Sequence, residues 1–365
     1  MNLAFFIEEV RVKHFIYVFL LLLISCSRQV SLQEASITQV ILLDDVTYQN
    51  AGMNIAAYKD HIYYMEDAGT DYRVHVLDSQ GEQDSVITIP KGKGPGEMTH
   101  NWRLKIFDDM IYLLDTSQNK IVVYDLQGEL VDDIFFDVTG ERITDFVVLS
   151  DSIVLEGVFK NKLLKLDKET GDILAKLEYD KVYQSVNEYF SSELREGVLA
   201  SHDGRIYLGY YNKPFRIDIF SDDLEHEKSI VKDYGEGYET CCWRSHPQGG
   251  VALMGHQMVY NVFITESEIT VPFGQGITYD KEGMHFMDVE NCVYVLNSES
   301  GKTTRKIWSS LLPMSGAGYT VLSVDERGLL LFLMYDDEAV QAVLDKTQTP
   351  YEELPRGLII RLAIE

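Results

Sequence analysis

Short apolar runs recur along almost the whole chain after residue 36, and they predict β-strands rather than helices. Several runs alternate apolar and polar residues with a period of two, as in residues 72–78 and 215–220, which is typical of half-buried strands. Tight turns separate them, each opened by Asp or Asn and followed by a Gly where a positive φ is expected. We expect an all-β domain, with one helical insertion at about residues 183–195.

The runs repeat at a spacing that predicts a β-propeller. The first run of each unit begins at His61, Met110, Ser152, Arg205, Val251, Met284 and Leu329. These starts lie about 42–53 residues from one another, except for one interval of 33. A four-stranded propeller blade takes about 40–50 residues. Seven runs predict seven blades, whereas the short interval indicates an incomplete unit and hence six. The strand at 37–43 is expected to pair with the last blade, which would close the ring and cover both sheet edges.

Two matching segments support the repeat. Residues 94–103 and 235–244 share five of ten positions at an offset of 141 residues, which equals three blades of about 47. We interpret both as links from the outer strand of one blade to the inner strand of the next. Each would deliver a Trp-Arg pair to the start of an inner strand near the mouth of the central channel, with the two pairs on opposite sides.

The first link has a sequence typical of one class of propeller. Its motif consists of Gly92, Gly94, Pro95, Gly96 and Glu97, and two strand-like runs follow at 111–114 and 121–124. This pattern resembles the NHL-repeat class, and more closely the six-bladed β-propeller lipoproteins. The resemblance covers roughly residues 36–365, although only the second blade has the specific motif, and it implies fold and location more than activity. A phosphate-binding loop is excluded, because no Lys-Ser/Thr follows the glycines and a strand follows instead of a helix.

The N-terminus predicts export and lipid anchoring. Basic residues at 11 and 13 precede an apolar run over 15–24, and Cys26 follows a small residue, as in a secretory signal. The cysteine resembles the modified residue of bacterial lipoproteins, with an uncleaved membrane anchor as the alternative. We therefore expect a signal peptide at 1–25, a polar tether at 26–35 and one propeller domain at 36–365. No acidic cluster follows the cysteine, so the expected location is the outer membrane, facing the periplasm.

Charge and cysteine content narrow the function classes. The formal net charge is −26 without a dense basic patch, so nucleic-acid binding is not expected. No cofactor is expected either. Cys241, Cys242 and Cys292 are either buried thiols or include one disulfide formed by Cys292. The Cys-Cys-x-x-x-His sequence ending at His246 has no second ligand pair, so no metal site is expected.

The two Trp-Arg pairs are the candidate binding residues. They are Trp102, Arg103, Trp243 and Arg244, with His100 and His246 close to them in the sequence. An aromatic ring and a guanidinium can stack on a sugar or hold a carboxylate; alternatively, the Trp packs between blades and the Arg pairs with local acids. The expected function is a binding module for a saccharide, a peptide or a partner protein. The alternative is a saccharide hydrolase or lyase that uses Arg, His and carboxylates at the channel mouth, although no serine-hydrolase or zinc-protease motif is present.

Overall fold

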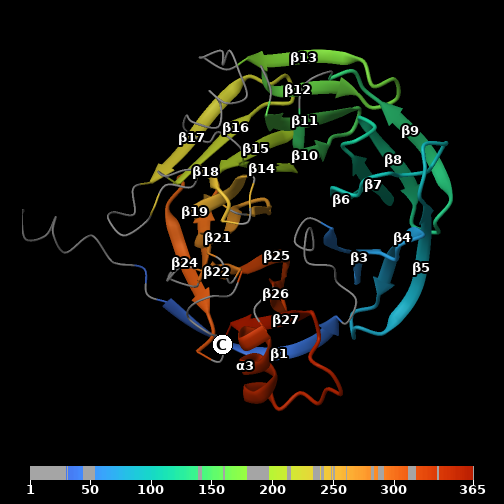
Figure 1. Ribbon diagram of the computed structural model, residues 1–365. Coiled ribbons are helices and arrows are strands. Elements are labelled where there is room, and N and C mark those ends of the chain that lie inside the picture. The colour runs from blue at the N-terminus through green and yellow to red at the C-terminus, as the bar shows by residue number, and fades with distance from the viewer. Residues whose placement is uncertain are drawn as a thin grey trace, which may run out of the picture.

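The protein forms a ring of β-sheets in a computed structural model, and these sheets are the blades of a propeller (Figure 1). The structure describes residues 30, 32–43, 54–138, 142–158, 161–178, 197–211, 215–232, 239, 242–247, 249, 251–259, 261–280, 283–286, 292–310, 318–334 and 337–364. The predicted signal peptide, Cys26 and the expected helical insertion at 183–195 lie outside these residues.

Four blades are regular antiparallel sheets whose strands follow the chain order from the centre of the ring outward. Blade 1 consists of β2 (Ile55–Tyr58), β3 (His61–Asp67), β4 (Asp71–Leu77) and β5 (Gln83–Pro90). Blade 2 consists of β6 (Arg103–Phe107), β7 (Met110–Asp115), β8 (Lys120–Asp125) and β9 (Leu130–Phe135). Blade 3 consists of β10 (Arg142–Val148), β11 (Ser152–Val158), β12 (Asn161–Asp167) and β13 (Ile173–Glu178). Blade 4 consists of β14 (Gly197–His202), β15 (Arg205–Tyr210), β16 (Phe215–Phe220) and β17 (His226–Lys232).

Blades 5 and 6 belong to one larger sheet. Blade 5 consists of β20 (Phe263–Ile264), the first part of β21 (Glu268–Tyr279), β23 (Val293–Asn297) and β24 (Thr303–Trp308). Blade 6 consists of β25 (Gly318–Asp325), β26 (Gly328–Met334), β27 (Gly357–Ile364) and, as its outer strand, β1 (Leu32–Leu43).

The N-terminal strand β1 closes the ring. It pairs antiparallel with β27 from Ala35 opposite Ile364 to Leu43 opposite Gly357, which confirms the predicted pairing of the first strand with the last blade. Its first three residues pair in parallel with β24 of blade 5. Because β1 begins at Leu32, the folded domain also includes four residues that the sequence analysis had placed in the tether. One strand therefore covers the edges of two neighbouring blades.

The blade number is six, because two of the seven recurring runs lie in one extension of blade 5. This extension contains β18 (Cys242–Ser245), β19 (Val251–Val259), β22 (Met284–Phe286) and the last part of β21. The runs that begin at Val251 and Met284 form β19 and β22, on either side of that long strand, which explains the short interval. The inner strands β2, β6, β10, β14, β20 and β25 contact one another in a closed ring.

One helix was not expected from the sequence. The helix α3 (Asp337–Thr347) lies between β26 and β27. Its first turn is acidic and its last turn contains Lys346, an arrangement that stabilises the helix dipole. Val340, Val343 and Leu344 are buried in the core shared by blades 4, 5 and 6; this spacing is helical, but it extends over only two turns. Within the described residues, no helix is long and apolar enough to cross a membrane.

The core lies between the blades and follows the alternation within each strand. In β7, Ile111 and Leu113 pack against blade 1, whereas Tyr112 and Leu114 pack against blade 3. Because successive side chains of a strand point to opposite faces, each strand contributes to two interfaces. The same alternation in the inner strands decides which polar side chains face the next blade.

The inner strands end at two opposite faces of the ring. The link face is the end at which the chain arrives from the preceding blade, as residues 91–102 do before β6. The hairpin face is the opposite end, at which each inner strand turns into the second strand of its blade, as at residues 58–61 in blade 1.

Candidate functional site

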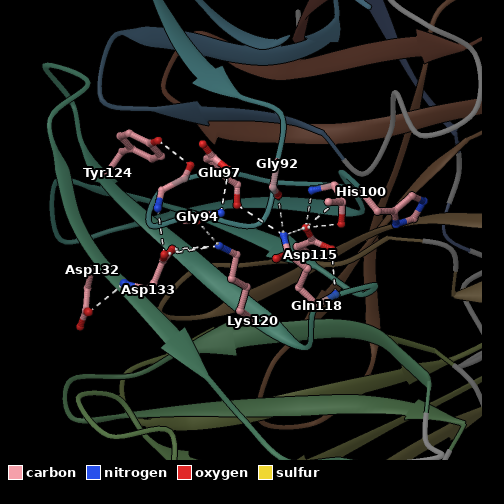
Figure 2. A network of polar contacts seen from close by, with 12 residues as sticks. Gly92, Gly94, Glu97, His100, Asp115, Gln118, Lys120, Tyr124, Asp132 and Asp133 are labelled. Atoms are coloured by element: carbon pink, nitrogen blue, oxygen red, sulfur yellow. Dashed lines mark hydrogen bonds and ion pairs between the residues drawn. The ribbon is translucent and has the colours of Figure 1, made fainter. Parts of the chain in front are cut away.

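The glycine motif lies in the link between β5 and β6 and encloses its own carboxylate (Figure 2). The Gly94 amide donates to Glu97 Oε2 at 2.7 Å. A Cβ added to Gly92 would lie 2.0 Å from the same oxygen, so a larger residue there would displace this carboxylate. Glu97 therefore fills the space that an anionic ligand would occupy in a glycine-rich binding loop.

The second half of the motif is bound to the outer strands of blade 2. Gly96 has a φ of 72°; its amide donates to Asp133 at 2.8 Å and its carbonyl accepts from the Tyr124 hydroxyl at 2.8 Å. The fully buried Lys120 joins the Gly94 carbonyl to Asp133. Burial, together with the charges of Asp133 and Glu97, raises the pKa of Tyr124 to about 12. These contacts give the motif a structural role, and Pro95 remains exposed on its surface.

A buried carboxylate orients the end of the link. Asp115 Oδ2 accepts from the amides of Thr99 and His100 and from the Gln118 side chain, while Oδ1 accepts from Ser117 and the Gln118 amide. Burial would raise the pKa of Asp115, but these hydrogen bonds outweigh it and hold the pKa below its usual value. The residues that follow thus leave the link in a defined direction.

His100 and Trp102 form an aromatic pair beside the ring of inner strands. Their rings stack at a centroid distance of 5.8 Å, and His100 Nδ1 lies 3.0 Å from the Thr116 hydroxyl. The Trp102 indole N–H donates to the Thr144 carbonyl of blade 3 at 2.8 Å. Trp102 is half-buried and also packs on the core between blades 2 and 3. The alternative considered from sequence, that this Trp packs between blades, is therefore correct for part of its ring.

Arg103 and Lys105 share one buried carboxylate of the next blade. Arg103 Nε lies 3.1 Å and Lys105 Nζ 3.2 Å from Asp145 Oδ1, and Asp145 is only 1% exposed. The Phe146 amide donates to the same oxygen, and the Leu199 amide of blade 4 donates to Oδ2. Asp145 thus joins the inner strands of blades 2, 3 and 4 around two cations.

Lys105 is the member of this cluster that solvent reaches. Its side chain is 27% exposed, and Nζ also donates to the Leu199 carbonyl at 3.0 Å. Burial lowers the pKa of Lys105 and the charge of Arg103 adds to this effect, although Asp145 opposes it. Lys105 and Asp145 were not among the residues predicted from the sequence. The alternation of Arg103, Leu104 and Lys105 was the available signal, because it places both cations on the face opposite to the buried leucine.

The second Trp-Arg pair does not lie on an inner strand, which corrects the predicted arrangement across the channel. Arg244 is in β18, which pairs with the first residues of β19 in the extension of blade 5. Its side chain is 45% exposed and lies 3.5 Å from Glu239. The side chain of Trp243 lies outside the described part of the structure. The two links match in sequence, but the strands that follow them take different places. The first link leads to the inner strand β6, whereas the second leads to β18 in the extension of blade 5.

His246 is a further candidate near the second link whose side chain the structure describes. His246 follows β18 and is half-buried. Cys292 is buried, and the Cys241 and Cys242 side chains lie outside the described residues. Over the described ranges, no group of three His, Cys, Asp or Glu side chains has the geometry to hold a metal ion.

Comparisons with known proteins agree with this architecture. Residues 43–152 match the model of the family DUF5128, which is described as a 6-bladed beta-propeller. The chain is a six-bladed β-propeller. The matched part of the propeller spans blades 1 and 2 and contains the glycine link. No curated protein matches the sequence.

Two solved structures resemble the propeller over almost its whole length. A member of the DUF4221 family from Bacteroides vulgatus has a TM-score of 0.56 at 11% identity, over 92% of this chain and 99% of its own. A candidate exported protein from Bacteroides fragilis has a TM-score of 0.55 at 12% identity, over 93% of this chain and 98% of its own. At these identities the likeness concerns the fold alone, so function must be argued from the site.

The groups around Asp145 are poorly arranged for proton transfer. Asp145 accepts from two amides and faces two cations, so its oxygens are occupied and it is poorly placed to exchange a proton with a substrate. A lysine ammonium has three donors, and two of those of Lys105 are directed to Asp145 and Leu199. Within the described residues, the third donor has no protein acceptor.

Proposed function

We propose that this propeller is a lipid-anchored binding module of the bacterial cell envelope that holds an acidic saccharide or peptide at the link face. The observation that carries the proposal is the partly exposed side chain of Lys105, held next to Arg103 on a single shared carboxylate. In a chain with a formal net charge of −26, two cations that share one carboxylate leave a local positive charge that attracts anions.

The neighbouring aromatic pair suits a saccharide ring or an apolar peptide side chain. His100 and Trp102 stack on one another, and Trp102 is connected through the Thr144 carbonyl to Arg103, which donates to the same oxygen at 3.3 Å. A planar aromatic surface beside a cation is a common arrangement for recognising sugars with carboxylate groups. The two features would thus contact different parts of one ligand.

Binding can be tested by calorimetric titration with trigalacturonate, hexaglutamate and the neutral sugar galactotriose. We expect the acidic ligands to bind and the neutral sugar not to bind. Lys105→Gln should weaken the acidic ligands at least about tenfold, because it removes the exposed charge. Lys302→Gln, at an exposed turn of blade 5, removes one charge elsewhere and should leave affinity unchanged. Equal affinities of the two variants would contradict the proposal.

A saccharide hydrolase or lyase is the second candidate. The convergence of Arg103, Lys105 and Asp145 favours it, whereas the saturated hydrogen bonding of Asp145 favours binding alone. Incubation with polygalacturonate distinguishes the two, since a hydrolase releases reducing ends and a lyase forms unsaturated products that absorb in the ultraviolet. Either product, if lost in Lys105→Gln, would favour the enzyme.

The anchor is supported by the N-terminal sequence that ends at Cys26, and one structural neighbour is a candidate exported protein. Cys26→Ala should move the protein from the membrane fraction to the soluble fraction of lysed cells. Unchanged fractionation would count against lipidation.

A further inference from the structure

A cavity of about 400 Å³ opens at the hairpin face, between blades 1, 5 and 6. Its apolar walls are formed by Ala57, Ile62, Phe263, Val324 and Leu330. The turn at 58–61 follows β2, whereas Trp102 precedes β6, so this cavity and the cluster around Lys105 lie at opposite ends of the inner strands. The volume is within the range of small-molecule sites.

A buried arginine forms the polar part of the cavity. Arg361 of β27 has a side chain that is only 10% exposed, and its Nη1 lies 3.0 and 3.2 Å from the two carboxylate oxygens of Asp325. Asp325 also accepts from the Nε and Nη2 of Arg327, at 3.2 and 3.0 Å. Burial would raise the pKa of Asp325, but the hydrogen bonds from Arg327 and the charge of Arg361 outweigh it and keep the group ionised.

This arrangement leaves part of Arg361 available. Two guanidinium groups face one carboxylate, so Asp325 fixes the orientation of Arg361 without neutralising both cations. Among the contacts within the described residues, Arg361 donates only through Nη1. The Arg361 side chain lines the cavity and is 10% exposed, and within the described residues its Nε and Nη2 have no protein acceptor. The Nε and Nη2 hydrogens form the parallel pair of donors that matches the two oxygens of a carboxylate.

The rest of the wall suits an aromatic body. Phe263, on the inner strand of blade 5, is half-buried and lines the cavity together with Leu330. The Tyr58 ring packs instead on the core between blades 1 and 2, and its hydroxyl accepts from the Asp109 amide. The Phe263 ring can contact a ligand ring by stacking or edge-to-face packing. Lys59 at the rim is paired with Asp109 at 2.5 Å, so it adds little charge of its own. The cavity therefore joins one fixed pair of donors to an apolar, partly aromatic surface.

We infer that this cavity binds a small carboxylate with an aromatic body, through the Nε and Nη2 edge of Arg361. The site is distinct from the proposed one at the link face and stands whether or not that one binds. The ring of such a ligand would occupy much of the cavity. Its carboxylate would point to Arg361 and away from Asp325.

Phenylacetate, phenylacetamide and phenethylamine provide matched neutral and cationic analogues for the test. In ligand-observed NMR titrations, we expect phenylacetate to bind with a dissociation constant on the order of 1 mM, as its size allows. The amide keeps the ring but loses the charge-assisted bonds, and it should bind at least about tenfold more weakly. The amine should not bind. Equal affinity of phenylacetate and phenylacetamide would overturn the inference.

Variants locate the site. Arg361→Gln should weaken phenylacetate at least about tenfold, and Phe263→Ala, which leaves Asp325 untouched, should weaken it about threefold through lost ring contacts. Arg205→Gln removes the same charge from an exposed pair with Glu227 in blade 4 and should titrate as the wild type does. Circular dichroism checks that each variant is folded. If Arg361→Gln fails to fold, Phe263→Ala decides, and unchanged affinity in it would reject the site.

Discussion

Lys105 Nζ donates to the Leu199 carbonyl at 3.0 Å, although β6 belongs to blade 2 and β14 to blade 4. The side chain thus extends past the inner strand of blade 3, where it also meets Asp145. Such a contact between non-adjacent blades is possible only near the axis, where the inner strands converge (Figure 1). It links the stability of three blades to one charged cluster.

Replacing Asp145 with Asn should destabilise the protein strongly. The change keeps the shape but removes the negative charge shared by Arg103 and Lys105. Breaking a buried ion pair costs about 3–5 kcal/mol when the partner stays charged, and because Lys105 is partly exposed we expect about 3 kcal/mol. The free energy of unfolding from urea titration measures this loss.

The double variant Asp145→Asn with Lys105→Met provides the control. It removes one of the two unpaired cations, so it should recover part of the lost stability. If both variants are equally unstable, the loss arises from the hydrogen bonds to Phe146 and Leu199 rather than from the charges.

Lys105 should also make stability depend on alkaline pH. Its pKa is lowered by burial and by Arg103, so the folded protein loses this proton at a lower pH than the unfolded chain, in which lysines titrate near pH 10.4. Between these values the unfolded chain binds more protons, and stability rises with pH. The unfolding free energy of the wild type minus that of Lys105→Met should therefore increase as the pH is raised from neutral towards about 10.4. A constant difference over this interval would show that the side chain titrates as in water.

The sequence predicted the features that depend on local alternation, and it missed those that depend on distant pairing. Period-two runs identified the strands, and strand 37–43 was correctly placed on the last blade because a closed ring must cover its edges. The extension of blade 5 was not predictable, since one strand, β21, pairs with two different sets of partners. In the site, the link motif made Arg103 a candidate. Asp145 was missed because it joins Arg103 only through contact between blades.

The glycine at position 92 should tolerate alanine only if Glu97 is shortened as well. A Cβ at Gly92 would lie 2.0 Å from Glu97 Oε2, so Gly92→Ala must displace this carboxylate and should cost about 1–3 kcal/mol. In a Glu97→Ala background the clash disappears, and the same change should cost less than about 1 kcal/mol. Thermal unfolding of the four proteins gives the coupling.

Gly204→Ala is the matched control for this cycle. Gly204 has a φ of 69° and no atom within 4 Å of an added Cβ. Its substitution tests backbone strain without a clash, and it should cost about 1 kcal/mol whether or not Glu97 is present.

Asp218 should be the most important buried carboxylate of blade 4. It is fully buried and accepts from Arg216, Tyr210 and Ser229, with Lys162 Nζ at 3.0 Å. Burial would raise its pKa, but these partners outweigh it and hold the pKa far below the usual value. Its contribution is therefore complete above about pH 4 and is lost as the pH falls towards the lowered value. Asp218→Asn should cost about 3 kcal/mol at pH 7.

A second carboxylate of blade 4 provides the comparison. Asp222 pairs with Lys165 at 2.6 Å but is 43% exposed, so Asp222→Asn should cost less than about 1 kcal/mol. If urea titration shows the same loss of unfolding free energy for both variants, burial does not determine the contribution of Asp218 to stability.

The N-terminal strand should be required for the ring to remain folded. A variant that begins at residue 32 keeps β1 and should fold as the full chain does, whereas one that begins at residue 44 loses it. The loss removes the pairing with β27 and the buried side chains of Ile41 and Leu43, and it exposes the edge of a sheet. We expect the shorter variant to aggregate or unfold, as measured by circular dichroism and gel filtration.

Point variants separate side-chain packing from strand pairing. Ile41→Ala should lower the free energy of unfolding by about 2–4 kcal/mol. Leu32→Ala, at a residue that is 44% exposed, should lower it by less than about 0.5 kcal/mol. A folded, monomeric variant beginning at residue 44 with an unchanged melting temperature would show that the ring closes without β1.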